Sequence, residues 1–283
     1  FGNKKEKLDP SLQKDSNNDR QPIFCGVDIK IPQINSVNKN IFAIVIGCEM
    51  YTDETSVPYA ENDAKVFKEY CLQTLGVSEK HIRYIANAGY NDMRKAVKWL
   101  RLGLEAYGGE GNVIFYYAGH GIPDESQKTA YLLPVDGIGS DVESGYSLEK
   151  LYQALGDMPA KSIIVFLDAC FSGAKRDGGM MASARGVAIK TKAEEPKGKM
   201  VVFSAAQDDE TAYPYKSQQH GMFTYYLLRK LQETKGDVTL GELADYITRE
   251  VKRQCFDENS RSQTPSVKAS ASFAESWRNL KLK

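Results

Sequence analysis

The sequence has no surplus of charge of either sign, no cysteine pattern typical of metal or disulfide sites, and no long apolar run. Lys plus Arg and Asp plus Glu both number 37, so no overall field attracts nucleic acid or an anionic membrane. The five cysteines are scattered and lack CxxC spacing, which argues against a zinc cluster or a disulfide framework. No run approaches the roughly 18 apolar residues of a membrane span. These absences leave a globular protein in which any recognition of a charged partner depends on a local group of residues.

Two further absences concern the start of the chain and the segment after its first strand. The segment "GCEMYTDE" (47–54) has a single glycine, which excludes the glycine-rich phosphate loop of a nucleotide-binding α/β domain. The chain begins with Phe1 rather than methionine. We interpret this as the sign of a removed upstream segment and expect an exported or cell-envelope protein.

The length and the local composition predict one folded domain with an N-terminal extension. At 283 residues the chain is long enough for one large domain or two small ones. Residues 1–39 are polar, rich in Lys, Asn and Asp, and without a clear period, so we expect a tail or linker there. We expect the folded domain to cover 40–283.

Short apolar runs that favour strands alternate with segments of helical period. The predicted strands are 41–47, 81–86, 112–118, 162–168 and 200–205. One helical segment, 91–108, places five apolar side chains on one stripe: Met93, Ala96, Val97, Leu100 and Leu104. Thr239 and Glu242 form a capping box at the start of a later helix. The alternation predicts an α/β sandwich on a mostly parallel sheet.

Two segments are predicted to be surface excursions. Residues 134–147 have the Gly, Asp and Ser content of a loop, and 173–199 have little apolar period. Loops of that length in compact domains are usually functional or disordered.

Two of the predicted strands end on residues typical of nucleophilic catalysis. The strand 112–118 is followed by a histidine between glycines, His120, and the strand 162–168 is followed closely by Cys170. In open α/β sheets the functional crevice lies outside the carboxyl ends of the strands. If the two strands are neighbours, His120 can take the Cys170 proton and later protonate a leaving amine. The backbone N–H groups of Gly121 and Cys170 are candidates for an oxyanion hole.

Each of these residues alone has a simpler interpretation. A cysteine after an apolar strand is more often a core residue than a nucleophile. It is the pair, each beside glycine and each at a strand end, that favours catalysis. The other histidines compete poorly, because His81 opens a strand, where packing or a surface position is expected, and His220 precedes a helix that it is expected to cap or pack against. Cys48 and Cys71 have no comparable context.

The motifs "FYYAGHG" (115–121) and "FLDACFSG" (166–173) resemble the caspase, metacaspase and paracaspase clan of cysteine peptidases. The resemblance covers about residues 40–272 in order. The caspase signature has Gln-Ala-Cys, whereas this chain has Asp168, as bacterial metacaspase-like members do. The resemblance implies a caspase-like α/β/α sandwich, with a central, mostly parallel sheet of about six strands flanked by helices. It also implies His120 and Cys170 as the catalytic dyad.

The resemblance also implies an acidic pocket for the substrate residue before the cleaved bond. It aligns "ENDA" (61–64) with a metacaspase motif whose aspartate, here Asp63, contributes to that pocket. Asp168 lies two residues before Cys170, so both face the same side of the strand. Two carboxylates there would bind Arg or Lys. The stretch 54–61, where a caspase that cuts after aspartate would supply an arginine, has none.

Both acids have structural alternatives. Asp168 can be an ordinary strand-end residue that pairs with a surface lysine. Helix capping alone can explain why Asn62 and Asp63 lie at the start of a helix. In the segment 204–214, Ser204 and Asp208 are further candidates for substrate binding by the same resemblance, whereas the acidic run 208–210 can also be a solvated turn or part of a calcium site. We predict no cofactor and no obligatory metal, with calcium dependence left open.

These observations predict a cysteine endopeptidase that cleaves proteins or peptides after Arg or Lys through an acyl-enzyme. The alternative is a catalytically silent caspase-like binding or regulatory module. In caspase-like enzymes the linker that corresponds to 173–199 is often cut during activation. Arg185 is the favoured site of self-cleavage, because small residues surround it in "MMASARGVAIK" (180–190).

Overall fold

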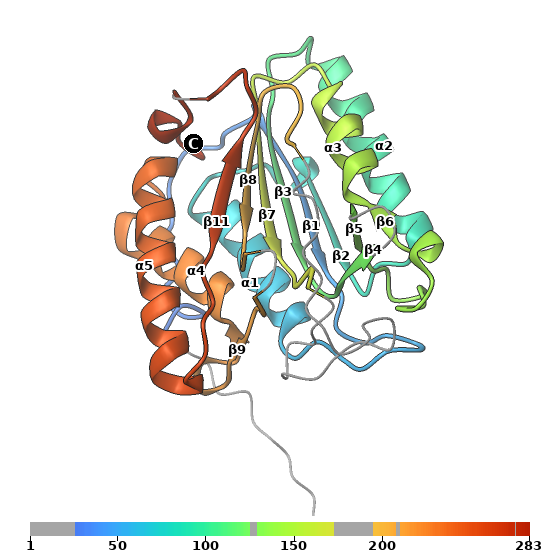
Figure 1. Cartoon of the computed structure of the whole chain (residues 1–283). Helices are drawn as coiled ribbons and strands as arrows, with labels where there is room; N and C mark the ends of the chain where they lie inside the picture. The colour runs from blue at the N-terminus through green and yellow to red at the C-terminus, as the bar shows by residue number, and fades with distance from the viewer. Residues whose placement is uncertain (1–25, 125–128, 173–194, 208–209, 275) are drawn as a thin grey trace, which may run out of the picture.

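A computed structural model of the chain describes residues 26–124, 129–172, 195–207, 210–274 and 276–283. At its centre lies a six-stranded sheet in the order β11–β8–β7–β3–β1–β2 (Figure 1). Its strands are β1 (Ile41–Gly47), β2 (Ile82–Ala86), β3 (Asn112–Ala118), β7 (Ser162–Asp168), β8 (Met200–Ser204) and β11 (Ser266–Ala269). All neighbouring strands are parallel except β8 and β11. The predicted sheet is confirmed, and each of the five predicted strands forms with its ends shifted by at most one residue.

Helices cover both faces of the sheet (Figure 1). On one face lie α1 (Ala60–Gln73), α4 (Met222–Thr234) and α5 (Leu240–Asn259), and on the other lie α2 (Tyr90–Ala106) and α3 (Leu148–Gly156). Because both faces are covered, the central strands are apolar almost throughout rather than alternating. The five residues of the predicted α2 stripe are all buried. The predicted capping box of α5 also forms, since Thr239 and Glu242 exchange hydrogen bonds.

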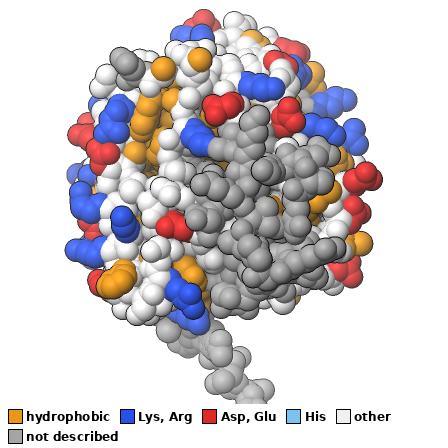
Figure 2. All heavy atoms as spheres, in the orientation of Figure 1, with side chains coloured by type: hydrophobic (Ala, Val, Ile, Leu, Met, Phe, Trp, Pro, Cys, Tyr) orange, Lys and Arg blue, Asp and Glu red, His pale blue; other side chains and the backbone are white. Residues whose placement is uncertain are grey.

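Short elements complete the described part of the chain. A small antiparallel sheet consists of β4 (Gly121–Asp124), β5 (Thr129–Leu132) and β6 (Tyr146–Ser147). A two-stranded ribbon, β9 (Pro214–Tyr215) and β10 (His220–Gly221), leads into α4. Single 3₁₀ turns lie at Glu79–His81, Val142–Ser144, Lys216–Gln218 and Ser276–Asn279. On the face shown in Figure 2, both basic side chains (Lys and Arg) and acidic side chains (Asp and Glu) lie around the rim.

Residues 26–38, here called the N-terminal strap, pack against the domain. Val27 is buried, and its carbonyl accepts a hydrogen bond from the Tyr70 hydroxyl at 2.9 Å. The Thr74 hydroxyl donates to the Pro32 carbonyl at 2.8 Å. The strap therefore lies against α1, although the sequence placed it in a tail or linker. The boundary between 39 and 40 stays a prediction, and residues 1–25 lie outside the described residues.

Two other predictions concern the excursion 173–199 and the lack of a membrane span. Of the predicted excursion 173–199, residues 173–194 lie outside the described residues, and Arg185 is among them. The described helices include none that is long and apolar enough to cross a membrane.

Candidate active site

The register of β3 and β7 brings His120 and Cys170 to the same edge of the sheet. The strands are parallel neighbours, and Ala118 lies opposite Asp168. His120 and Cys170 each follow two residues beyond that pair. The two segments that follow these strands also lie close together, because a Cβ on Gly121 would lie only 2.6 Å from the Cys170 carbonyl oxygen. Gly121 thus permits an approach that a side chain would prevent.

Three contacts fix the backbone and the ring of His120. The Tyr51 hydroxyl accepts the His120 N–H, and the Tyr117 hydroxyl donates to the His120 carbonyl, both at 2.8 Å. Nε2 of the ring lies 2.8 Å from the Thr55 carbonyl oxygen. Because a carbonyl only accepts, Nε2 carries the proton, and in the neutral ring Nδ1 is the basic nitrogen. Sequence reasoning missed Thr55, since it acts through its backbone.

The thiol of Cys170 lies against a neighbouring backbone segment. Its Sγ accepts the Ala212 N–H at 2.7 Å, and Cys170 is largely buried. Nearby, the Ser172 hydroxyl donates to the Glu210 carbonyl at 3.2 Å. The Cys170 thiol also donates to the Ala212 carbonyl at 3.6 Å, so both backbone groups of Ala212 contact the sulfur.

Side chains just before β11 bond to this segment. The Glu210 carboxylate accepts hydrogen bonds from the backbone and the hydroxyl of Thr264. Gln263 is fully buried, accepts the Tyr213 N–H and donates to the Ala205 carbonyl, both at 2.9 Å. The Glu210 carboxylate thus has a structural partner, in contrast to the solvated turn that the sequence allowed.

The remaining predicted residues of this region have different outcomes. Ser204 is the last residue of β8 and pairs with Leu167 and Ser266 in the sheet. Asp208 lies outside the described residues. In the described part of the chain, no three His, Cys, Asp or Glu side chains are grouped so as to hold a metal ion. The absence of a cofactor and the open question of calcium stay predictions.

The other described cysteines are buried thiols. Burial raises the pKa of Cys48 to about 12 and raises the pKa of Cys71 and of Cys255 as well. Such thiols stay protonated and unreactive near neutral pH. They therefore fit the expectation of buried free thiols, and Cys25 lies outside the described residues.

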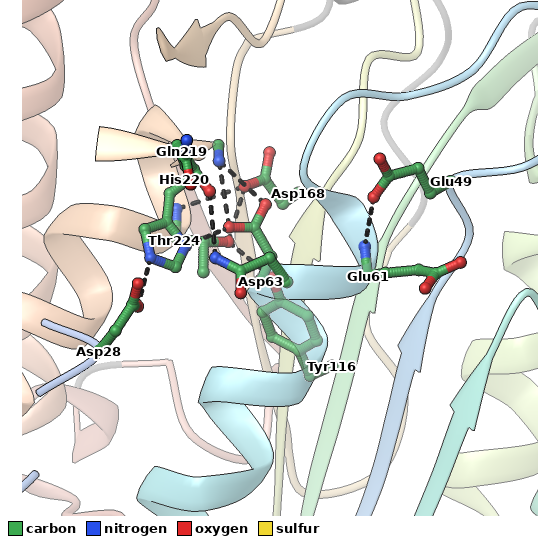
Figure 3. A network of polar contacts seen from close by, with 11 residues as sticks. Asp28, Glu49, Glu61, Asp63, Tyr116, Asp168, Gln219, His220 and Thr224 are labelled. Atoms are coloured by element: carbon green, nitrogen blue, oxygen red, sulfur yellow. Dashed lines mark hydrogen bonds and ion pairs between the residues drawn. The ribbon is translucent and has the colours of Figure 1, made fainter. Parts of the chain in front are cut away.

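The two predicted pocket acids, Asp63 and Asp168, both accept hydrogen bonds from the start of α4 (Figure 3). The Asp63 carboxylate accepts the Gly221 N–H at 2.9 Å and contacts Nδ1 of His220 at 2.7 Å. The Asp168 carboxylate accepts the Thr224 hydroxyl at 2.7 Å and its N–H at 3.3 Å. The positive end of the α4 dipole favours two negative charges there. Both carboxylates are almost fully buried.

These contacts correct both structural alternatives. Tyr59 is the N-cap of α1 and its side chain makes no capping bond, and the first-turn N–H of Glu61 donates to the Glu49 carboxylate at 3.0 Å. The Asp63 carboxylate is instead bonded to β10. Asp168 is only 1% exposed, so it is not a strand-end residue at the surface. Tyr116, from the "FYYAGHG" motif, extends the network, because its hydroxyl lies 2.6 Å from that of Thr224. Since the Thr224 hydroxyl donates to Asp168, Tyr116 donates to Thr224.

The two remaining histidines occupy different environments. His81 stacks on Phe42 at 4.2 Å between ring centroids, as the packing expectation requires. His220 is fully buried, but it contacts two carboxylates, those of Asp63 and Asp28. His220 therefore has polar contacts with two acids in addition to the capping or packing role expected from the sequence.

A sheet covered by helices on both faces, with histidine and cysteine at neighbouring strand ends, defines a caspase-like protein. The family model described as "Caspase domain" matches residues 41–274, and the chain belongs to this family. No curated protein matches it by sequence.

Two solved structures resemble the fold. The chain is similar to protein GSU0716 from Geobacter sulfurreducens, with a TM-score of 0.59 and 16% identity over 87% of this chain and 98% of that one. It is also similar to caspase-1 from Spodoptera frugiperda, with a TM-score of 0.56 and 14% identity over 88% of this chain and 93% of that one. At these identities the likeness concerns the fold alone.

Proposed function

We propose that the chain is a cysteine endopeptidase that cleaves proteins or peptides after Arg or Lys. Membership of the caspase-domain family gives the coarser statement, a cysteine-peptidase-like protein with protein substrates, although members of the family can be inactive. The observation that carries the proposal is the register of β3 and β7, since His120 and Cys170 each lie two residues beyond the paired residues Ala118 and Asp168.

The proposed reaction begins when Nδ1 of His120 takes the Cys170 proton. The thiolate attacks the scissile carbonyl carbon, a C–S bond forms, and the carbonyl oxygen becomes negative. The N–H groups of Gly121 and Cys170 stabilise this oxyanion. When the C–N bond breaks, His120 gives its proton to the leaving amine. Water, activated by His120, then hydrolyses the thioester.

Selectivity in this proposal comes from Asp63 and Asp168. Both carboxylates lie on the face of the sheet on which Cys170 lies. A bound guanidinium or ammonium group offsets their charge, and it also removes the electrostatic opposition of Asp168 to the Cys170 thiolate. Substrate binding and nucleophile activation are then coupled.

One observation favours the alternative of a catalytically silent module. The Cys170 sulfur accepts the Ala212 N–H, so the thiol is engaged by the chain itself. In the active enzyme that contact opens when the substrate binds. In a silent module it persists, and no substrate reaches the sulfur.

Labelling by a peptide acyloxymethyl ketone with arginine next to the warhead separates the two functions. An active enzyme forms one adduct at Cys170 under reducing conditions, as read from the intact mass and peptide mapping. The adduct is absent from Cys170→Ala and retained in Cys48→Ala, because Cys48 is a buried thiol on the other face of the sheet. If Cys170 takes up no label, the enzyme function is abandoned.

A further inference from the structure

His220 lies fully buried with a carboxylate at each ring nitrogen (Figure 3). Nδ1 is 2.7 Å from an oxygen of Asp63, and Nε2 is 2.8 Å from an oxygen of Asp28. An ionised carboxylate only accepts hydrogen bonds, so both contacts are satisfied together when both ring nitrogens carry protons. The Tyr225 ring of α4 lies 6.3 Å away between centroids. The geometry therefore fits an imidazolium that links two acids from distant parts of the chain.

His220 and its neighbour Gly221 together orient the Asp63 carboxylate. The imidazole contacts Oδ1, and the Gly221 N–H lies 3.1 Å from Oδ1 and 2.9 Å from Oδ2. Both donors come from β10, directly before α4. Because arginine binds a carboxylate best in a defined plane, the donors that fix this plane control what Asp63 offers to a cation.

The N-terminal strap holds Asp28 against His220. The Gln232 side chain of α4 donates to the carbonyls of Gly26 and Ile29, both at 2.9 Å. Tyr70 of α1 donates to the Val27 carbonyl between them. These contacts lie on both sides of Asp28 in the sequence. The fold thus fixes the position of its carboxylate, and the Asp28 side chain is only 8% exposed.

The charges explain why a second acid is useful at this place. An imidazolium beside Asp63 alone would cancel the charge that attracts a cation. Two carboxylates around one imidazolium leave the group of Asp28, His220 and Asp63 with a net negative charge. Asp28 therefore allows His220 to hold Asp63 without neutralising the site.

We propose that His220 and Asp28 are positioning residues for a cation site at Asp63, so that the N-terminal strap belongs to the substrate-selecting unit. This inference rests on the proposed function, in which Asp63 binds the Arg or Lys side chain of the substrate. Neither residue touches the reacting atoms. Their effect is on binding rather than on the chemical step.

Steady-state kinetics of the full chain test the proposal with a peptide amide that carries arginine before the cleaved bond. His220→Gln is expected to raise KM about tenfold and Asp28→Asn about fivefold, with kcat within about twofold of wild type. Asp245→Asn and His81→Gln are matched controls, since Asp245 is exposed on α5 and His81 packs on Phe42. Equal effects in the controls, or losses confined to kcat, would overturn the proposal.

Equilibrium binding separates this inference from the proposed function. Agmatine, a small guanidinium compound, is titrated by calorimetry into Cys170→Ala protein, and its affinity should fall by the same factors in the Asp28 and His220 variants. Binding without any cleavage by the wild type would refute the peptidase and leave the cation site. Cleavage after arginine with unchanged KM in both variants would refute the inference alone. No agmatine binding would overturn the inference outright.

A spectroscopic measurement covers the case in which His220→Gln does not fold. Nitrogen-15 NMR of the histidine rings should show both His220 nitrogens protonated at neutral pH in the wild type. In Asp28→Asn, Nε2 loses its charged partner, and the signals should shift toward the neutral ring. A wild-type His220 with one protonated nitrogen contradicts the proposal.

Discussion

The two faces of the central sheet differ in what they bury. The face under α2 and α3 packs apolar side chains almost exclusively, with Leu100 and Leu104 among them. The face under α1 and α4 has a similar apolar core, but it also buries Asp63, Asp168 and His220 at one end. Buried charges cost free energy unless they are paired. The buried acids of the candidate site are therefore confined to one face, whereas the other face contributes the Tyr117 hydroxyl that donates to the His120 carbonyl.

Substitution of the catalytic dyad should lower activity far more than substitution of a buried residue on the opposite face of the sheet. Cys170→Ala and His120→Ala are each expected to lower kcat/KM by about a thousandfold or more, because residues that act as one unit fail together. Both proteins should melt within a few degrees of the wild type. Cleavage of an arginine peptide amide, normalised to folded protein, provides the measurement.

Cys48→Ala is the matched variant on the opposite face, since Cys48 is buried and its Sγ contacts the Ala88 carbonyl at 3.7 Å. It should keep full activity. Comparable residual turnover in Cys170→Ala and Cys48→Ala would mean that the chemistry lies elsewhere.

Self-cleavage should depend on the same dyad. The predicted excursion 173–199 begins five residues after the last residue of β7, and we expect active protein at neutral pH to be cut after Arg185. Arg185→Gln should block that cut, and Cys170→Ala protein should stay whole, as followed by gel electrophoresis and terminal sequencing. Equal fragmentation of wild type and Cys170→Ala would identify a contaminating protease. An active enzyme that remains one chain would mean another form of control.

Neutralising the acids should change selectivity more than stability. Asp168→Asn is expected to lower kcat/KM for arginine substrates by about a hundredfold, and Asp63→Asn by less, because each removes a partner of a buried cation. A citrulline peptide, which has the shape of arginine without its charge, serves as the control substrate. If Asp168→Asn leaves the preference for arginine over citrulline unchanged, the assignment of the pocket is wrong.

The fold was largely predictable because its central strands are continuous apolar runs. The exception is β11, whose four residues "SVKA" (266–269) include a lysine and lie at the sheet edge. So short an antiparallel edge strand has no signal of its own. The ribbon of β9 and β10 was missed for the same reason, since each strand has two residues.

The site was predictable where it depends on motifs and not where it depends on tertiary contacts. His120 and Cys170 follow recognisable strand ends, and Asp168 is the last residue of such a strand. Thr55 and Ala212 act through backbone atoms, so their residue types carry no signal. The contact of His220 with Asp28 joins positions 192 residues apart, and a single sequence does not show such pairs.

A cavity on the apolar face should affect stability without affecting selectivity. Leu100 of α2 is fully buried in the apolar cluster. Leu100→Ala is expected to lower the free energy of unfolding by about 2–5 kcal/mol, from lost burial and the cavity left behind. Chemical denaturation measures this loss. The KM for an arginine peptide should not change in the folded fraction, and a changed KM would show that the two faces are coupled.

The smallest effect is expected at the start of α5, on the outer layer of the site face. The Glu242 carboxylate accepts hydrogen bonds from the Thr239 backbone and hydroxyl, and these bonds hold the pKa of Glu242 below its ordinary value. Thr239→Ala should lower the free energy of unfolding by about 1 kcal/mol, as the loss of a helix cap usually does. Activity per folded molecule should stay constant, because the cap lies outside the network of Asp63 and Asp168.

The pH dependence of this small effect identifies its source. A carboxyl group with a lower pKa in the folded state stabilises the protein above its unfolded pKa and loses that contribution as the pH falls through its folded pKa. Glu242→Gln should therefore melt below the wild type at neutral pH, and the difference should shrink as the solution is acidified into the carboxyl range. Melting curves at a series of pH values measure it. A difference that stays constant as the solution is acidified would show that the charge of Glu242 does not stabilise the cap, and that only the shape of its side chain matters there.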